Sequence, residues 1–316
     1  MEKGISKAQW IEQVNRELKD SRSWKDLKWL VDEGLEIEAF YHPDDHILPV
    51  GPILWRGSNK WQIATWNKWP VEKESLEHQL QSGVESLIIE CASDYMPVAK
   101  LIQGLRENHK AEFQISILQS DGEAPGSTEN LLIRSGLTVN GLQLFEISTE
   151  VKGHIDQIVN LLEQLLKSPE HCQSVLMIPI GQTLLAEIAK IRALKVIILN
   201  LWNNQKRDRS LLPEIECHVH PDSNMDAYTD LISKSGRAVI CVVAGCDRLV
   251  LHRHKGDELP KHLDVNIHHI LRHEGGLDTV EDPLAGSYII DRITQLFVEH
   301  SWRRLKETWA GQIESK

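Results

Sequence analysis

Eight short runs of apolar or alternating residues recur between residues 62 and 254, and most neighbouring runs are separated by a segment with helical periodicity. Strands that alternate with helices pair in parallel through right-handed crossovers, and eight is the number that closes a barrel. The pattern therefore predicts an α/β fold, a (β/α)8 TIM barrel, over residues 61–291. The predicted strands are residues 62–66, 86–92, 113–119, 142–148, 174–180, 195–201, 215–221 and 248–254.

A doubly wound open sheet is the other fold in which strands and helices alternate. Its nucleotide-binding form carries a glycine-rich loop, G-x-G-x-x-G or G-x-x-x-x-G-K-[ST], directly after a strand. Neither loop follows any of the eight runs. The sequence therefore favours the barrel, because an open sheet here would lack a nucleotide-binding loop.

Residues 1–60 are predicted to form an extended and helical arm ahead of the barrel. Residues 6–20 place Trp10, Ile11, Val14 and Leu18 on one helical face. Seven of the ten tryptophans lie in the first 69 residues, which is a large apolar area for a solvated segment. We therefore expect the arm to pack on its own barrel or on a partner. A further helix is expected over residues 292–316.

Charge and cysteine usage restrict the class of protein. The formal net charge of −11 argues against a nucleic-acid or anionic-membrane surface, because either needs a concentrated basic face. No apolar run approaches the ~20 residues of a membrane span, and the first residues lack a secretory apolar region. The five cysteines are odd in number and form no C-x-x-C pair. These features are typical of a reduced, cytoplasmic protein.

Histidines alternate on the last two predicted strands, at His218 and His220 and at His252 and His254. Side chains at i and i+2 share one face of a strand, so four imidazoles could gather at the carboxyl-terminal mouth of the barrel. A divalent metal site is one interpretation. With no cysteine pair or HExxH-type spacing nearby, the sequence favours polar residues hydrogen-bonded to backbone and water. The four histidines are therefore weak candidates, and no bound metal is expected.

Three segments carry a pattern more specific than the rhythm of strands and helices. They are the arm, with its Trp-led helix and a Glu-Gly-x-x-Ile stretch at 33–37, then residues 226–251, and then residues 259–294. The third contains Glu-Asp-Pro-Leu-Ala-Gly-Ser-Tyr at 281–288, read as a stop, a turn and a strand-like restart. Together they resemble the methylmalonyl-CoA mutase family of cobalamin-dependent isomerases, in which the third segment closes the substrate barrel.

Departures from that family bear on function. In its catalytic subunits the eighth strand carries a histidine that contacts the substrate thioester carbonyl, within a Gln-Ser-Leu-His-Thr-Asn run. The matching run here is residues 247–252, and the histidine position holds Val250, which cannot polarise a carbonyl. The cobalamin-ligating Asp-x-His-x-x-Gly motif is not in the sequence. The resemblance therefore implies a non-catalytic small, or β, subunit, truncated after the barrel and lacking the cobalamin-binding domain.

The same resemblance implies a heterodimer. Its catalytic large subunit would hold adenosylcobalamin and interconvert methylmalonyl-CoA and succinyl-CoA, whereas this chain alone would bind no cofactor. In heterodimeric mutases the corresponding arm wraps the other subunit, so Trp10, Trp24 and Trp29 are expected to face the partner. Two alternatives stay open. One is an autonomous metal-dependent barrel hydrolase that uses the four histidines, and the other is a substrate-binding barrel that receives a separate cobalamin-binding chain.

Overall fold

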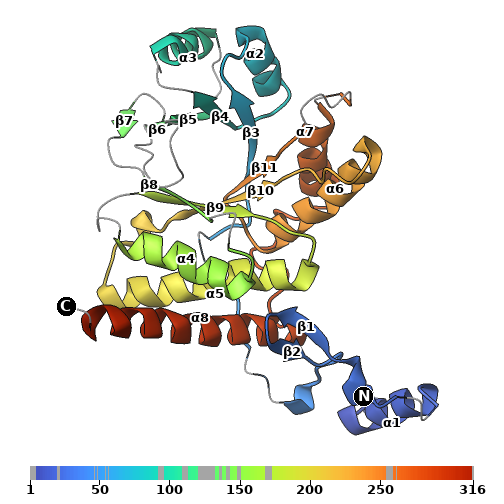
Figure 1. Cartoon of the computed structure of the whole chain (residues 1–316). Coiled ribbons are helices and arrows are strands. Elements are labelled where there is room, and N and C mark those ends of the chain that lie inside the picture. Colours follow the sequence, from blue (N-terminus) through green and yellow to red (C-terminus); the bar gives the residue numbers. More distant parts are fainter. Residues whose placement is uncertain are drawn as a thin grey trace.

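A seven-stranded parallel sheet forms the centre of the computed structural model (Figure 1). The structure describes residues 5–314, except 20–21, 46, 48, 54, 56, 92–95, 109–112, 120–131, 135–136, 140–142, 148–150, 168–172, 254–258 and 261. The strands are β3 Gln62–Lys68, β4 Ser86–Cys91, β5 Gln114–Gln119, β8 Gln143–Glu146, β9 Ser174–Pro179, β10 Glu214–Val219 and β11 Arg248–Leu251. Seven of the eight predicted strands are therefore confirmed.

The strand order distinguishes this sheet from a doubly wound one. Along the sheet the order is β5-β4-β3-β11-β10-β9-β8, so the first and last strands are neighbours in the middle. From β3 to β5 and again from β8 to β11, each strand lies next to the one before it, always on the same side. Right-handed crossovers then place all the connecting helices on one face, which is the winding of a barrel. Within the described residues, β5 and β8 are the edges of this curled sheet.

The helices lie around the outer face of the sheet (Figure 1). Helices α2 and α3 accompany β3 to β5, α4 and α5 accompany β8 to β10, and α6 and α7 accompany β10 and β11. Their bounds are α2 Lys73–Gln81, α3 Met96–Asn108, α4 His154–Lys167, α5 Leu184–Gln205, α6 Ala227–Val243 and α7 His262–His269, with a π-helical turn at Ile270–Glu274. A short antiparallel pair, β6 Leu132–Arg134 and β7 Leu137–Val139, lies between β5 and β8 in sequence.

The prediction of a strand at 195–201 is wrong, because these residues form the second half of α5. Helix α5 lies between the sheet and the long helix α8, Tyr288–Glu314 (Figure 1). A helix covered on both sides is apolar all round, so its sequence loses the amphipathic period that marks a surface helix. A continuous apolar run such as Val196–Leu199 cannot then be told from a buried strand.

The segment after α7 also differs from expectation. Residues 288–291 were expected to restart as a strand, but they are the first turn of α8, which therefore begins four residues earlier than 292. The turn before the helix requires Gly286, whose φ of +83° is strained for other residues. Asp282 holds this turn against the rest of the protein through two contacts. Its carboxylate accepts a hydrogen bond from the Ile53 amide and pairs with the buried Arg192 of α5 at 2.6 Å.

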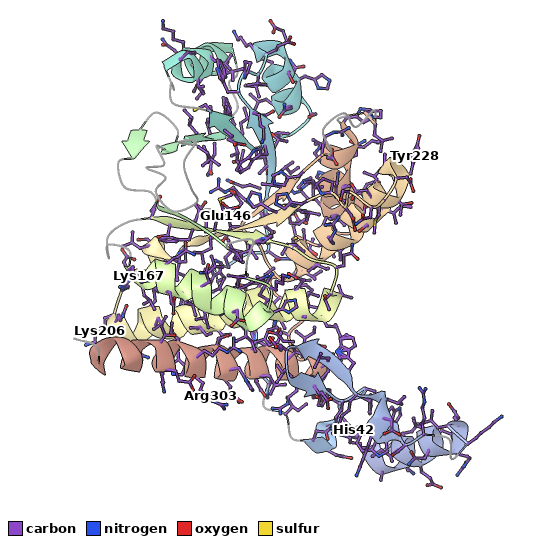
Figure 2. The ribbon with its side chains drawn as sticks, viewed as in Figure 1. His42, Glu146, Lys167, Lys206, Tyr228 and Arg303 are labelled. Atoms are coloured by element: carbon purple, nitrogen blue, oxygen red, sulfur yellow. The ribbon has the colours of Figure 1, made fainter. Side chains whose placement is uncertain are left out.

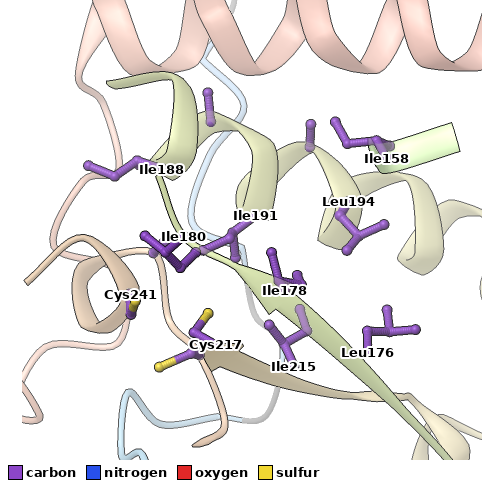
Figure 3. Packing of buried hydrophobic residues seen from close by; sticks show 14 of the residues in the cluster. Ile158, Leu176, Ile178, Ile180, Ile188, Ile191, Leu194, Ile215, Cys217 and Cys241 are labelled. Atoms are coloured by element: carbon purple, nitrogen blue, oxygen red, sulfur yellow. The ribbon is translucent and has the colours of Figure 1, made fainter. Parts of the chain in front are cut away.

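Alternation along the strands separates two apolar regions. Side chains pointing outward from β9 and β10 pack against α4, α5 and α6, as Figure 3 shows for Leu176, Ile178, Ile215 and Cys217, with Cys241 of α6 nearby. Inward-pointing residues form a separate small cluster on the concave face, consisting of Ala64, Ile88, Leu118 and Val250 with Trp66 against it. The sheet therefore has one fully covered face and one inner face with its own packing.

The arm is attached to this body by a small hairpin, β1 Trp29–Asp32 and β2 Leu35–Ile37. Val31, Leu35 and Ile37 are buried in the same core cluster as α4, α5 and α8. Helix α1, Lys7–Glu17, stands away from the sheet (Figure 1), and none of its residues is buried. No helix in the described part of the chain is both long enough and apolar enough to cross a membrane.

Candidate functional site

A cavity of about 260 Å³ opens on the concave face, where the parallel strands end. Barrel enzymes place their sites at this carboxyl-terminal end of the strands. Side chains from five strands and the residues directly after them surround the cavity. They are Trp66, Lys68, Glu90, Glu146, Met177, Pro179, His218, His220 and His252. Figure 2 shows Glu146 beside the strands, far from the surface residue Tyr228 on α6.

Polar side chains continue from the cavity into the sheet along one face of β10. Glu214, Glu216 and His218 alternate on that strand, so they point inward together. Arg248 of the neighbouring β11 joins two of them, through a 2.6 Å contact from Nη2 to Glu214 and a 3.2 Å contact from Nε to Glu216. Arg248 is buried, and although burial lowers the pKa of its guanidinium, Glu216 and Glu214 outweigh this and raise it. The positive charge of Arg248 thus compensates the negative charges of Glu214 and Glu216 within the sheet, next to the cavity.

Three histidines meet at the upper end of this row. His218 Nε2 lies 2.8 Å from Glu216 Oε1, and His218 Nδ1 lies 2.8 Å from His252 Nε2. The His220 ring stacks on the His252 ring at 4.2 Å between centroids. One ring nitrogen from each of the three lies within 4.8 Å of one from each of the others. The structure therefore brings three of the four predicted histidines together, and His254 lies outside the described residues.

The backbone of this cluster is fixed from three directions. The carbonyl of His218 accepts a hydrogen bond from the Ile180 amide at 2.9 Å, and the amide of His252 donates to the Val219 carbonyl at 2.9 Å. Arg237 of α6 donates from Nη1 to the His220 carbonyl at 2.6 Å. The strand ends that present the histidines are thus held by the sheet and by a helix behind it.

An indole forms one side of the cavity. Trp66 lies edge-on to His218 and tilted to His252, with ring centroids 5.5 Å apart in both pairs. Trp66 Nε1–H donates to Glu90 Oε2 at 3.1 Å, and Lys68 Nζ lies 3.5 Å from the same oxygen. A carboxylate and an ammonium group therefore line the cavity beside the three imidazoles.

The electrostatics of the cavity favour uncharged rings at His220 and His252. Desolvation, followed by the neighbouring His218 and His220, lowers the pKa of His252 to about 2. Desolvation, followed by His218 and Arg237, lowers the pKa of His220 to about 4. Both rings are therefore neutral at physiological pH, and a neutral imidazole is the form that can act as an acceptor or a ligand.

Beneath the histidines the concave face is filled. Val250 pairs with His218 and with Ala64 in the sheet register, and it packs with Ile88 and Leu118 without exposure to solvent. Val250 is therefore an interior packing residue, one inward-facing position before His252, which directly follows β11. Alternation in the sequence could identify Glu216 and Arg248 as inward-facing, but Trp66 and Glu90 lie on strands with no predicted site residue.

The three tryptophans predicted to face a partner lie in the arm. Trp10 stacks on Phe40 at 4.6 Å and meets Trp24 edge-on at 6.5 Å. Both are half-buried within the arm itself, whereas Trp29 on β1 is 40% exposed. A second histidine pair, His269 and His273, stacks at 5.8 Å on α7 and the π-helical turn, away from the cavity.

Comparison with known proteins finds similarity in the carboxyl-terminal part of the chain. Residues 172–311, from β9 into α8, match the family model of methylmalonyl-CoA mutase. A methylmalonyl-CoA mutase of Rhizobium meliloti is 30% identical over 142 residues, which is 42% of this chain and 20% of that protein. One of Cereibacter sphaeroides is 29% identical over 142 residues, with the same shares. The family resemblance seen in residues 226–251 and 259–294 is confirmed.

A third relative is a methylmalonyl-CoA mutase small subunit of Porphyromonas gingivalis, 25% identical over 138 residues. The match covers 39% of this chain and 22% of that protein. The matched part of the chain thus spans about a fifth of the length of each of these relatives.

Proposed function

We propose that this chain is a non-catalytic small subunit of a heterodimeric methylmalonyl-CoA mutase. In this proposal a larger partner subunit interconverts methylmalonyl-CoA and succinyl-CoA. The family match over residues 172–311 supports the mutase, and the similarity to a protein named as a small subunit supports the role.

Val250 is the observation that carries the proposal. It holds the position where catalytic members of the family have the histidine that contacts the thioester carbonyl. Its side chain is fully buried among Ala64, Ile88 and Leu118, and it offers no hydrogen bond. Losing one such donor from an active site costs about 2.7–4 kcal/mol of transition-state stabilisation. Val250 also speaks against the alternative in which this chain is a substrate barrel completed by a separate cobalamin-binding chain.

The family is cobalamin-dependent, and we place adenosylcobalamin in the partner subunit. The cavity at the strand ends measures about 260 Å³, below the roughly 300–1,000 Å³ of sites for drug-sized ligands, and cobalamin is larger than these. The residues around that cavity therefore do not fit the cofactor. The packed layer of Ala64, Ile88, Leu118 and Val250 would likewise obstruct an acyl-CoA arm threaded through the concave face.

The proposal extends to the fold and to the domains. We infer a TIM-type barrel over residues 61–291, built on the seven-stranded curled sheet. Residues 1–60 would be the subunit-interaction segment, with Trp10, Trp24 and Trp29 against the partner. The position of α1, which stands away from the sheet without a buried residue, supports this assignment.

A turnover assay on the purified full chain tests the non-catalytic role. With adenosylcobalamin and methylmalonyl-CoA we expect no succinyl-CoA, and no corrin absorbance in the protein peak after gel filtration. The Rhizobium meliloti mutase, assayed in parallel, is the positive control. Turnover by the chain alone, or corrin retained at one equivalent per chain, would overturn the proposal.

A further inference from the structure

We propose that His218, His220 and His252 together bind one divalent first-row transition-metal ion, with Zn²⁺ as the first candidate. The site lies where β10 and β11 end, inside the cavity of the concave face. The sequence favoured an ordinary polar role for these histidines, because their spacing along the chain matches no metal motif. The cross-strand geometry points to the metal instead, and it does so independently of the mutase proposal.

The separations among the imidazoles suit a shared ion. Zinc bonds to histidine nitrogens at about 2.0–2.1 Å, so two ligand nitrogens of a tetrahedral site stand about 3.3–3.4 Å apart. His218 Nδ1 and His252 Nε2 are 2.8 Å apart, and nitrogens of all three residues lie within 4.8 Å of one another. The 2.8 Å pair is at hydrogen-bond distance, so its two nitrogens would have to separate by about 0.5 Å to share one ion.

The surroundings of His218 are those of a metal ligand. An ionised Glu216 can only accept, so His218 Nε2–H donates to it, and His218 Nδ1 faces His252 Nε2 at 2.8 Å, a hydrogen bond that an ion bound between the two rings would replace. Arg248 in turn holds Glu216 through its second carboxylate oxygen at 3.2 Å. A histidine ligand that donates its other N–H to a carboxylate is the usual arrangement around bound zinc, and it fixes both ring orientation and tautomer.

The donor set selects the class of ion. Three imidazoles suit zinc, copper, iron or nickel, whereas Mg²⁺ and Ca²⁺ require oxygen ligands. Three protein ligands leave a fourth position open, as in catalytic zinc sites, and the cavity lies on that side. Glu90, held by Trp66 and Lys68, lines the same cavity and offers a carboxylate that could act beside a bound ion.

A competition titration tests the site. The full chain is freed of metal with a chelator, then titrated with Zn²⁺ against a chromophoric chelator, and Co²⁺ is added separately to record visible absorption. We expect one Zn²⁺ per chain and the strong absorption of four-coordinate Co²⁺. His252→Ala and His220→Ala should each weaken zinc binding by at least about 100-fold, and Glu216→Gln by about 10–100-fold.

The exposed His273 provides the matched control, because it also stacks on a second histidine, His269, but outside the cavity. His273→Ala should bind zinc within about twofold of the parent chain. His252→Gln, which keeps most of the side-chain volume, separates loss of a ligand from loss of fold, and circular dichroism checks each variant. Fewer than ~0.2 zinc per chain, or equal binding by folded His252→Gln and the parent, would overturn the proposal.

Discussion

Single buried charges connect segments that lie far apart in the sequence. Asp282 precedes α8 and yet pairs with Arg192 in the middle of α5, and both side chains are at most 5% exposed. Arg192 Nη2 also lies 3.6 Å from the buried Asp291 in the first turn of α8. The Asp-Pro-Leu-Ala-Gly-Ser signature thus has a structural role here, because it fastens the outermost helix to the helix beneath it.

Asp282→Ala should therefore destabilise the chain strongly. It removes one partner of a buried ion pair and leaves the Arg192 guanidinium without its closest charge, a loss that costs about 3–5 kcal/mol. Urea denaturation followed by circular dichroism measures the change in unfolding free energy. Glu299→Ala, at an exposed position of α8, should change it by about 0.5 kcal/mol or less. A loss near zero for Asp282→Ala would contradict this role.

The candidate site shows what sequence can and cannot predict about individual residues. Strand alternation placed His218 and His220 on one face, and the structure agrees. Alternation cannot give the register between strands, which brings His252 to 2.8 Å from His218, because register depends on packing across the sheet. Trp66 and Glu90 reach the cavity from strands that carry no histidine, so no local pattern indicates them.

Among the secondary-structure elements, predictions failed where an element is buried on both sides. Helix α5 lies between the sheet and α8, and the continuous apolar run in its residues 195–201 predicts a strand instead of a helix. At α8 the failure was local, because Tyr288-Ile289-Ile290 suits a strand by composition but continues into a long helix. The seven remaining strands and helix α4 were predictable, because a short apolar or alternating run marks each strand and a one-sided apolar stripe marks the helix.

A histidine couples the arm to the helices, and it should make stability depend on pH. His154, at the start of α4, lies 3.9 Å from Asp32 of β1 and 3.3 Å from Glu187 of α5. Desolvation lowers the pKa of His154, but Asp32 and Glu187 outweigh it and raise the pKa to about 9. Because the folded pKa exceeds the unfolded value of about 6.5, the charged histidine stabilises fully below pH ~6.5. This contribution, roughly 3 kcal/mol at most, is lost as the pH rises to about 9.

Unfolding free energies at pH 6 and pH 9 check the prediction. The parent chain should exceed His154→Gln in stability at pH 6, and the gap between them should close toward pH 9. A gap that stays constant, or widens with rising pH, would show that His154 does not act through its charge. The hairpin would then be held by the burial of Val31, Leu35 and Ile37 and by the hydrogen bond from the Ile155 amide to Asp32.

The whole molecule combines a sheet that winds in one direction, helices on its outer face and an arm that reaches outward (Figure 1). The sequence predicted this general architecture because connection handedness and strand alternation are local rules. It could not fix closure of the barrel, which depends on how the two edge strands β5 and β8 meet. The concave face keeps a polar cavity above a packed layer, and the proposed role follows from that layer together with the family match over residues 172–311.

Native mass spectrometry of the tagged full chain, purified from its own cells, shows whether the proposed heterodimer exists. We predict a one-to-one complex with a larger, cobalamin-carrying mutase subunit. Replacing Trp10, Trp24 and Trp29 together by alanine should reduce that complex while the chain stays folded. A free chain, or a complex of this chain with itself alone, would contradict the account.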